Sequence, residues 1–437
     1  MARLPVPLSQ QAQRTADSPI TWFIQQAVEN PRFVSLAAGL VDPVTLPAAE
    51  VAEAVAYLMA RPELAQAALQ YGTTQGHAPL RAQLLERVCA RDNVQPTDLS
   101  LNSHDIVLTT GSQQLLYFLG DLLVDPGDII ITEAPTYFVC RETFHSAGAR
   151  VLTVPVDEHG MNVDALEELL VRLEATGELE RLRFIYVVDY FQNPTGLSLS
   201  AARRPRVVEL ARKFSRTHRI LVVEDAAYRE LRYDGPDLPS LKSYDPDNSH
   251  VILAMTFSKP CAPGLKTGYG VLPADLVGPL LHLKGVHDFG SNNLTLHILD
   301  RLMESGAYDT ITARLCSTYR TKRDALLAAL ATEFAGLPPA LTPRWTRPAG
   351  GLYVWMTCPD SVATGHGSPF MDAALREGVL YVPGEFCFLD SAEPAPTNQL
   401  RLSFGVVTPE QLQEGARRLA RAYRSAIGTP NALAGAR

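Results

Sequence analysis

Short runs of apolar and β-branched residues alternate with longer amphipathic stretches through most of the chain. The short runs are typical of strands buried on both faces, and they lie at 106–110, 129–132, 151–154, 184–188, 220–223 and 251–255. Helical spacing is found between them, at 115–123, 166–173 and 207–214. Strands separated by helices predict an α/β fold whose mostly parallel sheet is sandwiched by helices. We expect this large domain over residues 51–310.

The last third of the chain has a different pattern. It predicts two helices and two strands, the helices at 308–334 and 409–427 and the strands at 347–356 and 400–404. The first of these strands is entered through Gly350 and Gly351. We therefore expect a smaller α+β domain over residues 311–437, with residues 1–50 forming an N-terminal arm and part of this domain.

Composition narrows the class of protein. The chain has 437 residues, of which 46% are hydrophobic and 20% are charged, so it can bury a large core. A net charge of −8 argues against a nucleic-acid-binding protein, which needs clustered basic residues. The six cysteines form no C-x-x-C pair, and this argues against a zinc site or a disulfide framework. The first residues lack the apolar run of a signal peptide, and no stretch is long enough for a membrane span. We expect a cytoplasmic protein without a metal site.

Lys259 follows the predicted strand at 251–255 and is followed by Pro260. A lysine after a strand is most often a solvated surface charge. The carboxyl ends of parallel strands are, however, where such sheets bind ligands. A partly desolvated amine at that edge can act as a nucleophile that forms a Schiff base.

Three more polar segments follow other predicted strands. Asp225 and Tyr228 come after 220–223, Asn193 lies in an Asn-Pro-Thr-Gly segment after 184–188, and residues 111–113 follow 106–110. Each has an ordinary explanation, namely a helix cap, a turn and a helix start. The functional alternatives are a carboxylate that pairs with a protonated pyridine nitrogen, a fixed amide donor, and a phosphate site at a helix N-terminus.

Taken together, the four segments run Gly-Ser-Gln, Asn-Pro-x-Gly, Asp-x-x-Tyr and Ser-Lys along one predicted sheet. This order resembles the class I/II aminotransferases, which depend on pyridoxal 5'-phosphate (PLP) and have fold type I, and in particular the branch with 2-aminoadipate and kynurenine-type aminotransferases. The resemblance extends over about 18–426. It also includes the segments at 71–81, 133–137, 347–351, 382–384 and 400–404.

The resemblance implies a role for each residue. Lys259 would hold PLP as an internal aldimine and later carry the proton, and Asp225 would pair with the pyridine nitrogen. The other implied cofactor contacts are Tyr228 and Asn193 on the ring's phenolic oxygen, Tyr137 on the ring face, Gly111, Ser112, Gln113, Thr256 and Lys266 at the phosphate, and Tyr71 from the partner subunit of a homodimer with shared active sites. The implied substrate contacts are Arg401, Gly39 and Asn193 at the α-carboxylate, and Thr21 near the side chain.

Three positions depart from the family's usual pattern. Lys266 stands where an arginine is usual, and Pro260 directly after the Schiff-base lysine is unfamiliar. Thr21 stands where 2-aminoadipate enzymes tend to have an arginine for an acidic side chain. The last departure predicts a donor with an aromatic or bulky apolar side chain, unless Arg14 or Arg32 supplies the charge.

We therefore expect an aminotransferase that moves an amino group between an L-amino acid, which is aromatic, bulky apolar or 2-aminoadipate-like, and a 2-oxo acid. Its partners would be these small molecules, and neither nucleic acid nor a membrane. A PLP-dependent lyase, decarboxylase or oxidase on the same fold is the first alternative, because the cofactor contacts would be the same. An effector-binding regulator with an aminotransferase-like domain is the second. It would need an N-terminal DNA-binding module, for which too few residues precede Ser18.

Overall fold

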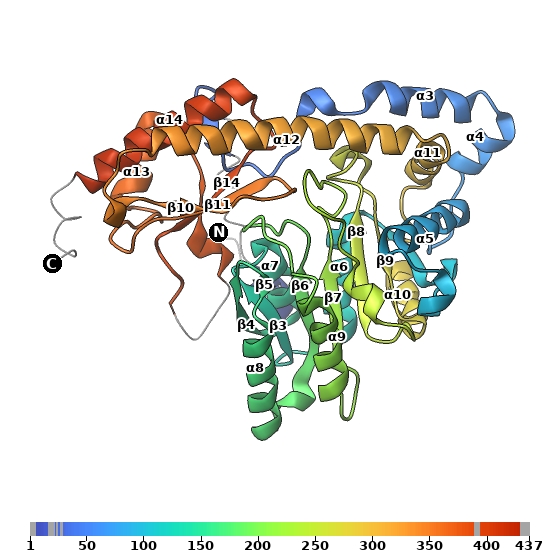
Figure 1. The fold of residues 1–437 in the computed structure, drawn as a ribbon. Helices are drawn as coiled ribbons and strands as arrows, with labels where there is room; N and C mark the ends of the chain where they lie inside the picture. Colours follow the sequence, from blue (N-terminus) through green and yellow to red (C-terminus); the bar gives the residue numbers. More distant parts are fainter. Residues whose placement is uncertain (1–5, 16–21, 23–24, 27–28, 389–393, 429–437) are drawn as a thin grey trace, which may run out of the picture.

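An eight-stranded sheet forms the centre of the larger part of the molecule (Figure 1). The computed structural model describes residues 6–15, 22, 25–26, 29–388 and 394–428. The sheet has the order β2-β9-β8-β7-β6-β3-β4-β5. Its strands are β2 (Ile106–Thr109), β3 (Ile129–Ala134), β4 (Arg150–Asp157), β5 (Gly160–Met161), β6 (Leu182–Val188), β7 (Leu221–Asp225), β8 (Val251–Thr256) and β9 (Gly268–Val271).

The sheet is mixed, although its central strands are parallel. β4, β3, β6, β7 and β8 pair in parallel, whereas β9 runs antiparallel to both of its neighbours and β5 runs antiparallel to β4. The sequence pattern predicts each of the central strands but misses β9. The reason is composition, because two of the four residues of β9 are glycines, which weaken a strand signal.

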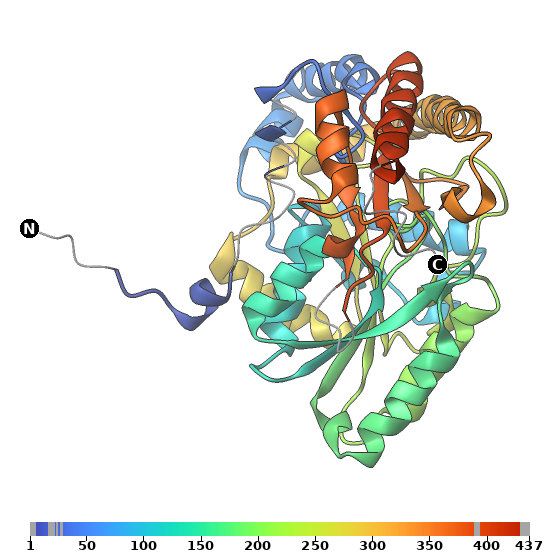
Figure 2. The same cartoon turned by 90° about the vertical axis from the view of Figure 1, so that its left-hand side faces the viewer.

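Helices cover both faces of this sheet, as predicted (Figure 2). Successive residues of β3 point to opposite faces. Ile129 and Ile131 belong to the core beneath α8 (Val163–Ala175) and α9 (Arg203–Phe214). Ile130 belongs to the core beneath α6 (Gly111–Leu123), α7 (Phe138–Ala147) and α10 (Ala274–His287). Further helices in the described part of the first 304 residues include α1 (Gln10–Arg14), α3 (Ala48–Met59), α4 (Pro62–Leu69), α5 (Ala78–Asp92) and α11 (Asn293–Glu304).

A second, smaller sheet lies in the C-terminal part. It has the antiparallel order β10-β11-β14-β13. Its strands are β10 (Arg344–Trp345), β11 (Tyr353–Thr357), β13 (Val382–Pro383) and β14 (Gln399–Ser403), and its helices are α13 (Pro369–Glu377) and α14 (Pro409–Ile427). In addition, β1 (Val34–Ser35) pairs with β12 (Val379–Leu380), so a segment near the N-terminus lies beside this part.

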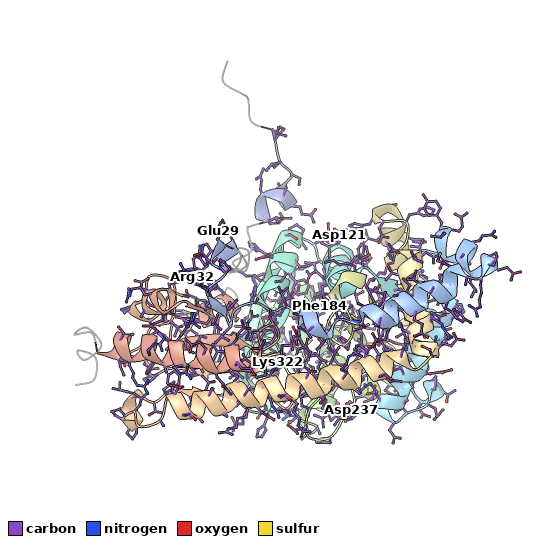
Figure 3. All side chains as sticks on the ribbon, turned by 90° about the horizontal axis from the view of Figure 1, so that it is seen from above. Glu29, Arg32, Asp121, Phe184, Asp237 and Lys322 are labelled. Atoms are coloured by element: carbon purple, nitrogen blue, oxygen red, sulfur yellow. The ribbon has the colours of Figure 1, made fainter. Side chains whose placement is uncertain are left out.

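The long helix α12 (Ala307–Glu333) runs beside both parts, and Figure 3 shows it from above, with Lys322 labelled. It extends across the boundary expected at residue 310, so the domain limits stay predictions. The strand expected at 347–356 is wrong in its first half, because 347–352 form a loop and β11 begins at Tyr353. Gly351 in this loop has a φ of +70°, which a strand cannot contain. None of the helices in the described ranges combines the length and apolar composition that a membrane span needs.

Candidate active site

A cavity of about 250 Å³ lies at the carboxyl ends of β6, β7 and β8. It brings together ten of the residues predicted from the sequence: Gly111, Ser112, Gln113, Tyr137, Asn193, Asp225, Tyr228, Thr256, Lys259 and Lys266. Sequence reasoning missed five further lining residues, namely Thr110, Val188, Ala227, Ser258 and Pro263. Most of these flank a predicted residue, so the strand ends already indicated where they would lie.

Asp225 ends β7, and its carboxyl group is buried against the cavity. Its Oδ2 accepts a hydrogen bond of 2.8 Å from the Tyr186 hydroxyl. Its Oδ1 has no hydrogen-bond partner in the part of the chain that the structure describes. Burial raises the pKa of Asp225 from 3.8 to about 6, against the opposing hydrogen bonds. Since a buried, unpartnered carboxylate oxygen is costly, a cationic N–H donor fits this position. The pyridinium nitrogen of PLP is such a donor.

The opposite end of the cavity suits an anion. α6 begins at Gly111, and no side chain caps its first N–H groups. Gly268 of β9 packs directly against this turn, where a Cβ atom would come within 2.5 Å of the Ser112 nitrogen. The Thr256 hydroxyl donates to the Ser258 hydroxyl at 3.0 Å on the same side. Together with the Lys266 amine, these groups form a donor set that matches a phosphate.

Lys259 lies in the turn after β8, and its side-chain amine reaches the cavity. Its Nζ donates to the Gly39 carbonyl at 2.9 Å and lies 6.0 Å from the centre of the Tyr228 ring. The unfamiliar Pro260 is accommodated in this turn, which the Cys261 amide closes by donating to the Phe257 carbonyl at 3.0 Å. The amine is thus placed beside the ring residues and beside the Gly39 loop.

Arg401 of β14 lies behind Asn193 and is buried. Its Nη1 donates to Asn193 Oδ1 at 2.8 Å, and its Nη2 donates to the Ala37 carbonyl at 2.7 Å. Its Nε has no partner among the residues described. The Tyr353 ring lies 4.4 Å from this guanidinium, and the Tyr353 and Tyr228 hydroxyls lie 3.2 Å apart. Arg401 therefore keeps one unused donor nitrogen while it holds Asn193, which lines the cavity.

Gly39 leaves space at the same place. A Cβ atom at this position would come within 2.5 Å of the Tyr353 hydroxyl oxygen. The Gly39 carbonyl binds Lys259, and Ala37, two residues earlier, binds Arg401. The N-terminal loop thus connects the amine and the guanidinium, which belong to different sheets.

Three described residues of the predicted site are not among those that line the cavity: Arg401 and Gly39, which contact the lining residues Asn193 and Lys259, and Tyr71. Tyr71 is 82% exposed, and its ring packs edge-to-face on Phe289 at 5.6 Å, beside a separate pocket of about 500 Å³. Thr21 lies outside the described residues.

The loop before Asn193 has an unusual backbone. Tyr190 and Phe191 are both left-handed, with φ of +58° and +57°. This conformation costs an L-residue about 1–2 kcal/mol, and both side chains are large. A Cβ atom at Gly350 would clash with the Phe191 ring, and one at Gly351 would clash with the Phe191 Cβ and carbonyl oxygen, so these two glycines make room for Phe191. The sequence analysis offered a turn or a fixed Asn193 amide donor here, and it did not predict the left-handed conformation of either residue.

Comparisons with known proteins identify the family of this chain. Residues 33–419 match the family Aminotransferase class I and II. The aromatic-amino-acid aminotransferase 1 of Thermococcus litoralis is 36% identical over 90% of this chain and 88% of its own length. The 2-aminoadipate transaminase of Thermus thermophilus is 35% identical over 91% of this chain and 92% of its own.

A solved structure gives the same result. The kynurenine aminotransferase of Pyrococcus horikoshii, in complex with PMP, superposes with a TM-score of 0.86 at 32% identity and covers 97% of this chain and 98% of its own. The expected fold type I, the cofactor and the enzyme class are thereby confirmed. The chain belongs to the class I and II aminotransferases and is a PLP-dependent transaminase.

Proposed function

We propose that this aminotransferase takes its amino group from an L-amino acid with an aromatic or bulky apolar side chain and passes it to a 2-oxo acid. The observation that supports the proposed site is the arrangement around one cavity of the Lys259 amine, the unpartnered Asp225 Oδ1 and the Asn193–Arg401 pair. These groups match, in order, a covalent attachment point, a partner for a cationic nitrogen and a carboxylate clamp.

Different residues of the cavity would contact different parts of the cofactor. Asp225 would keep the pyridine nitrogen protonated, and Tyr228 and Asn193 would donate to the ring oxygen. The phosphate would be bound by the N–H groups at the start of α6 with Ser112, and by Thr256, Ser258 and Lys266. When bound, PLP supplies an electron sink for the substrate's Cα bonds.

The chain itself supplies proton transfer and orientation. The Lys259 amine is the basic group placed to remove a proton from the substrate's Cα and to return it. Arg401 would bind the α-carboxylate through its unpartnered Nε and through its two Nη atoms. The Nη atoms donate to neutral oxygens of Asn193 and Ala37, and a charged carboxylate is a stronger acceptor that can replace these. The carboxylate would then fix the Cα–H bond relative to Lys259.

Arg401→Ala is expected to lower kcat/KM for all donors and all acceptors together, because every substrate carries the α-carboxylate. The expected loss of transition-state stabilisation is about 2–5 kcal/mol. Steady-state kinetics with at least three donors measure this, and Arg418→Ala, at an arginine paired with Glu414, is the control. A loss confined to one donor would mean that Arg401 binds a side chain instead.

An aromatic cluster supports the proposed donor class. Trp22 contacts His366 edge-to-face at 4.8 Å, and His366 contacts Phe386 at 5.7 Å. The next residue, Cys387, accepts a hydrogen bond of 2.8 Å from the Thr136 amide, directly before Tyr137 of the cavity. Neither Arg14 nor Arg32, the alternative cations, lines the cavity. The T. litoralis relative is named for aromatic amino acids.

A donor screen tests this preference. We expect phenylalanine, tyrosine or leucine to convert the cofactor's absorption band to that of the pyridoxamine form faster than 2-aminoadipate or glutamate does. The reason is that no arginine is found among the described residues that line the cavity, so an acidic side chain would lack a cationic partner there. Stopped-flow absorbance with each donor gives the rates. A clear preference for 2-aminoadipate or glutamate would refute the proposed donor class and would leave the proposed cofactor site unaffected.

We further propose a homodimer with shared active sites. Leu69, Tyr71, Val286 and Phe289 are large, exposed apolar residues on or beside α4 and α10. Such a concentration of exposed apolar side chains is typical of an interface. Tyr71 would then reach the phosphate of the partner subunit.

Mixed dimers test this sharing. Lys259→Ala and Tyr71→Ala subunits, each weak or inactive alone, are expected to regain activity when they are mixed and allowed to exchange. Each mixed dimer has one site with both residues intact, so random exchange should give about a quarter of the wild-type activity. A mixture no more active than its two components would show that Tyr71 serves its own subunit or none.

The cytoplasm is the proposed compartment. All six cysteines lie in the described residues, and all are free thiols, five of them buried. Free thiols fit a reducing compartment.

A further inference from the structure

The two left-handed residues Tyr190 and Phe191 stand immediately before Gln192 and Asn193. Asn193 lines the cavity and binds Arg401, so the path of this loop decides where the Asn193 amide points. A strained backbone persists only where surrounding contacts hold it. The structure shows which contacts do so.

One buried carboxylate closes the loop. Asp189 Oδ1 accepts hydrogen bonds from the amides of Tyr190 at 2.6 Å and Leu199 at 3.1 Å. Asp189 Oδ2 lies 2.6 Å from Nη1 of Arg204, and both side chains are completely buried. Asp189 thus binds the backbone at both ends of the loop, at Tyr190 and Leu199, and its ion pair with Arg204 fixes it to α9.

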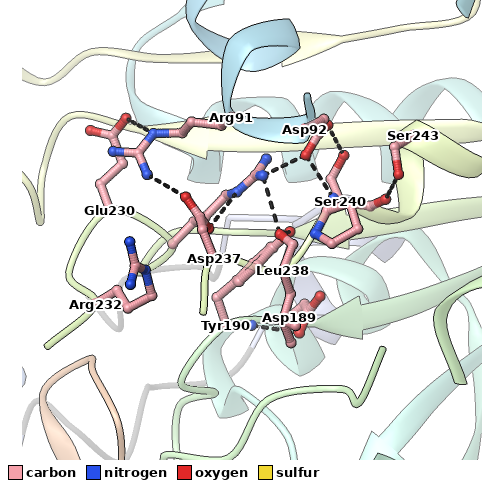
Figure 4. Close-up of polar contacts among 12 residues, drawn as sticks. Arg91, Asp92, Asp189, Tyr190, Glu230, Arg232, Asp237, Leu238, Ser240 and Ser243 are labelled. Atoms are coloured by element: carbon pink, nitrogen blue, oxygen red, sulfur yellow. Dashed lines mark hydrogen bonds and ion pairs between the residues drawn. The ribbon is translucent and has the colours of Figure 1, made fainter. Parts of the chain in front are cut away.

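The ring of Tyr190 is held by two cations. The guanidinium carbons of Arg204 and Arg229 lie 4.5 Å and 5.0 Å from the ring centre. The Tyr190 hydroxyl donates to the Leu238 carbonyl at 2.9 Å. Figure 4 shows Tyr190 with Asp189 and Leu238. Cation–π contacts are strong where the cation is removed from water, as both guanidinium groups are here.

Arg229 connects this contact to the segment that carries Tyr228. It directly follows Tyr228, and its guanidinium pairs with the buried Asp92, which also binds Ser240. Asp237 lies next to this pair and binds Arg91 at 3.0 Å (Figure 4). The Tyr190 ring thus contacts one cation from α9, Arg204, and one from the Tyr228 segment, Arg229.

We infer that Tyr190 is a positioning residue, whose ring, held by Arg204 and Arg229, keeps the strained loop in the path that aims Asn193 at the cofactor's ring oxygen. This inference rests on the proposed contact between Asn193 and that oxygen. Tyr190 itself does not line the cavity.

The pH titration of the bound cofactor's visible absorption band provides the test. A hydrogen bond donated to the negative ring oxygen lowers the pH at which the bound cofactor loses its proton, so a misplaced Asn193 raises this midpoint. Asn193→Ala is the reference, with an expected rise of about one pH unit. Tyr423→Ala is the stability control, because Tyr423 is another buried tyrosine whose hydroxyl donates to a backbone carbonyl, that of Leu341.

Four substitutions at Tyr190 separate positioning from simple packing. Tyr190→Ala and Tyr190→Leu remove the ring but keep the left-handed strain, and we expect both to raise the midpoint by about half a pH unit or more. Tyr190→Gly also removes the ring but adopts a positive φ without strain, so it should raise the midpoint less than alanine does. Tyr190→Phe keeps the ring between the guanidinium groups and should leave the midpoint unchanged. If Tyr190→Ala does not fold, Tyr190→Leu takes its place in the comparison.

Two results would overturn the inference. In the first, the alanine and leucine variants lose thermal stability, as Tyr423→Ala does, while their midpoints stay at the wild-type value. In the second, glycine raises the midpoint as much as alanine. A different failure, in which Asn193→Ala itself leaves the midpoint unchanged, would refute the proposed Asn193 contact and with it the basis of the inference.

Discussion

Lys259→Ala should abolish transamination and leave a folded protein. The amine of Lys259 is placed both to attach the cofactor and to move the proton at the substrate's Cα, so one substitution removes two functions. We expect kcat to fall by at least about 10⁴-fold, which is the upper range for loss of a general base alone. Coupled assays at saturating PLP measure this loss, because they remove weak cofactor binding as its cause.

The control for this prediction is another lysine of the large sheet's helices. Lys213 lies on α9 and pairs with Glu167 at 2.7 Å, and Lys213→Ala should keep full activity. The other lysine of the cavity, Lys266, is the alternative candidate for the attachment of the cofactor. If Lys259→Ala kept substantial activity and Lys266→Ala lost it, the two residues would have to exchange roles.

Asp225→Ala should slow catalysis about a thousandfold or more at saturating cofactor. The carboxylate stabilises the positive pyridine nitrogen, and that charge makes the ring an effective electron sink. A loss of several kcal/mol in transition-state stabilisation corresponds to this factor. Single-turnover kinetics with a good donor report it directly. A near-normal rate would show that another group serves the nitrogen.

The pH dependence of cofactor binding gives a second measure of Asp225. In the cofactor-free protein, burial raises the pKa of this carboxyl to about 6. Below that pH the group is protonated and must lose its proton to pair with a pyridinium, so cofactor affinity should fall by up to about tenfold per pH unit. Asp225→Asn should lack this step. Asp105 is the control, because it is a buried carboxyl outside the cavity and burial raises its pKa too. Asp105→Asn should still show the fall in cofactor affinity at low pH.

Much of the site could be predicted because its residues stand at the ends of strands. Asp225 ends β7, Lys259 follows β8, and the turn at Gly111 follows β2, so apolar runs along the chain already place them at one edge of a sheet. Asn193 lies a few residues after β6 and could be predicted in the same way. The fold class followed from the same runs.

Other features depend on contacts between distant segments, which no local pattern records. The strand β9 is glycine-rich because Gly268 must approach the Ser112 amide closely, and that requirement hides it from a strand pattern. Gly350 and Gly351 interrupt the predicted strand at 347–356, where Phe191 packs against both of them. The buried ion pair of Asp189 with Arg204 joins segments whose sequence gives no sign of pairing.

Borohydride reduction of the holoenzyme, followed by peptide mapping by mass spectrometry, tests most directly whether the cavity at the ends of β6–β8 holds the cofactor on Lys259. The reduction fixes the cofactor to whichever amine carries it. We expect the label on the peptide that contains Lys259 and the loss of that label in Lys259→Ala. A label on Lys266 or on any lysine outside the cavity would contradict the assignment.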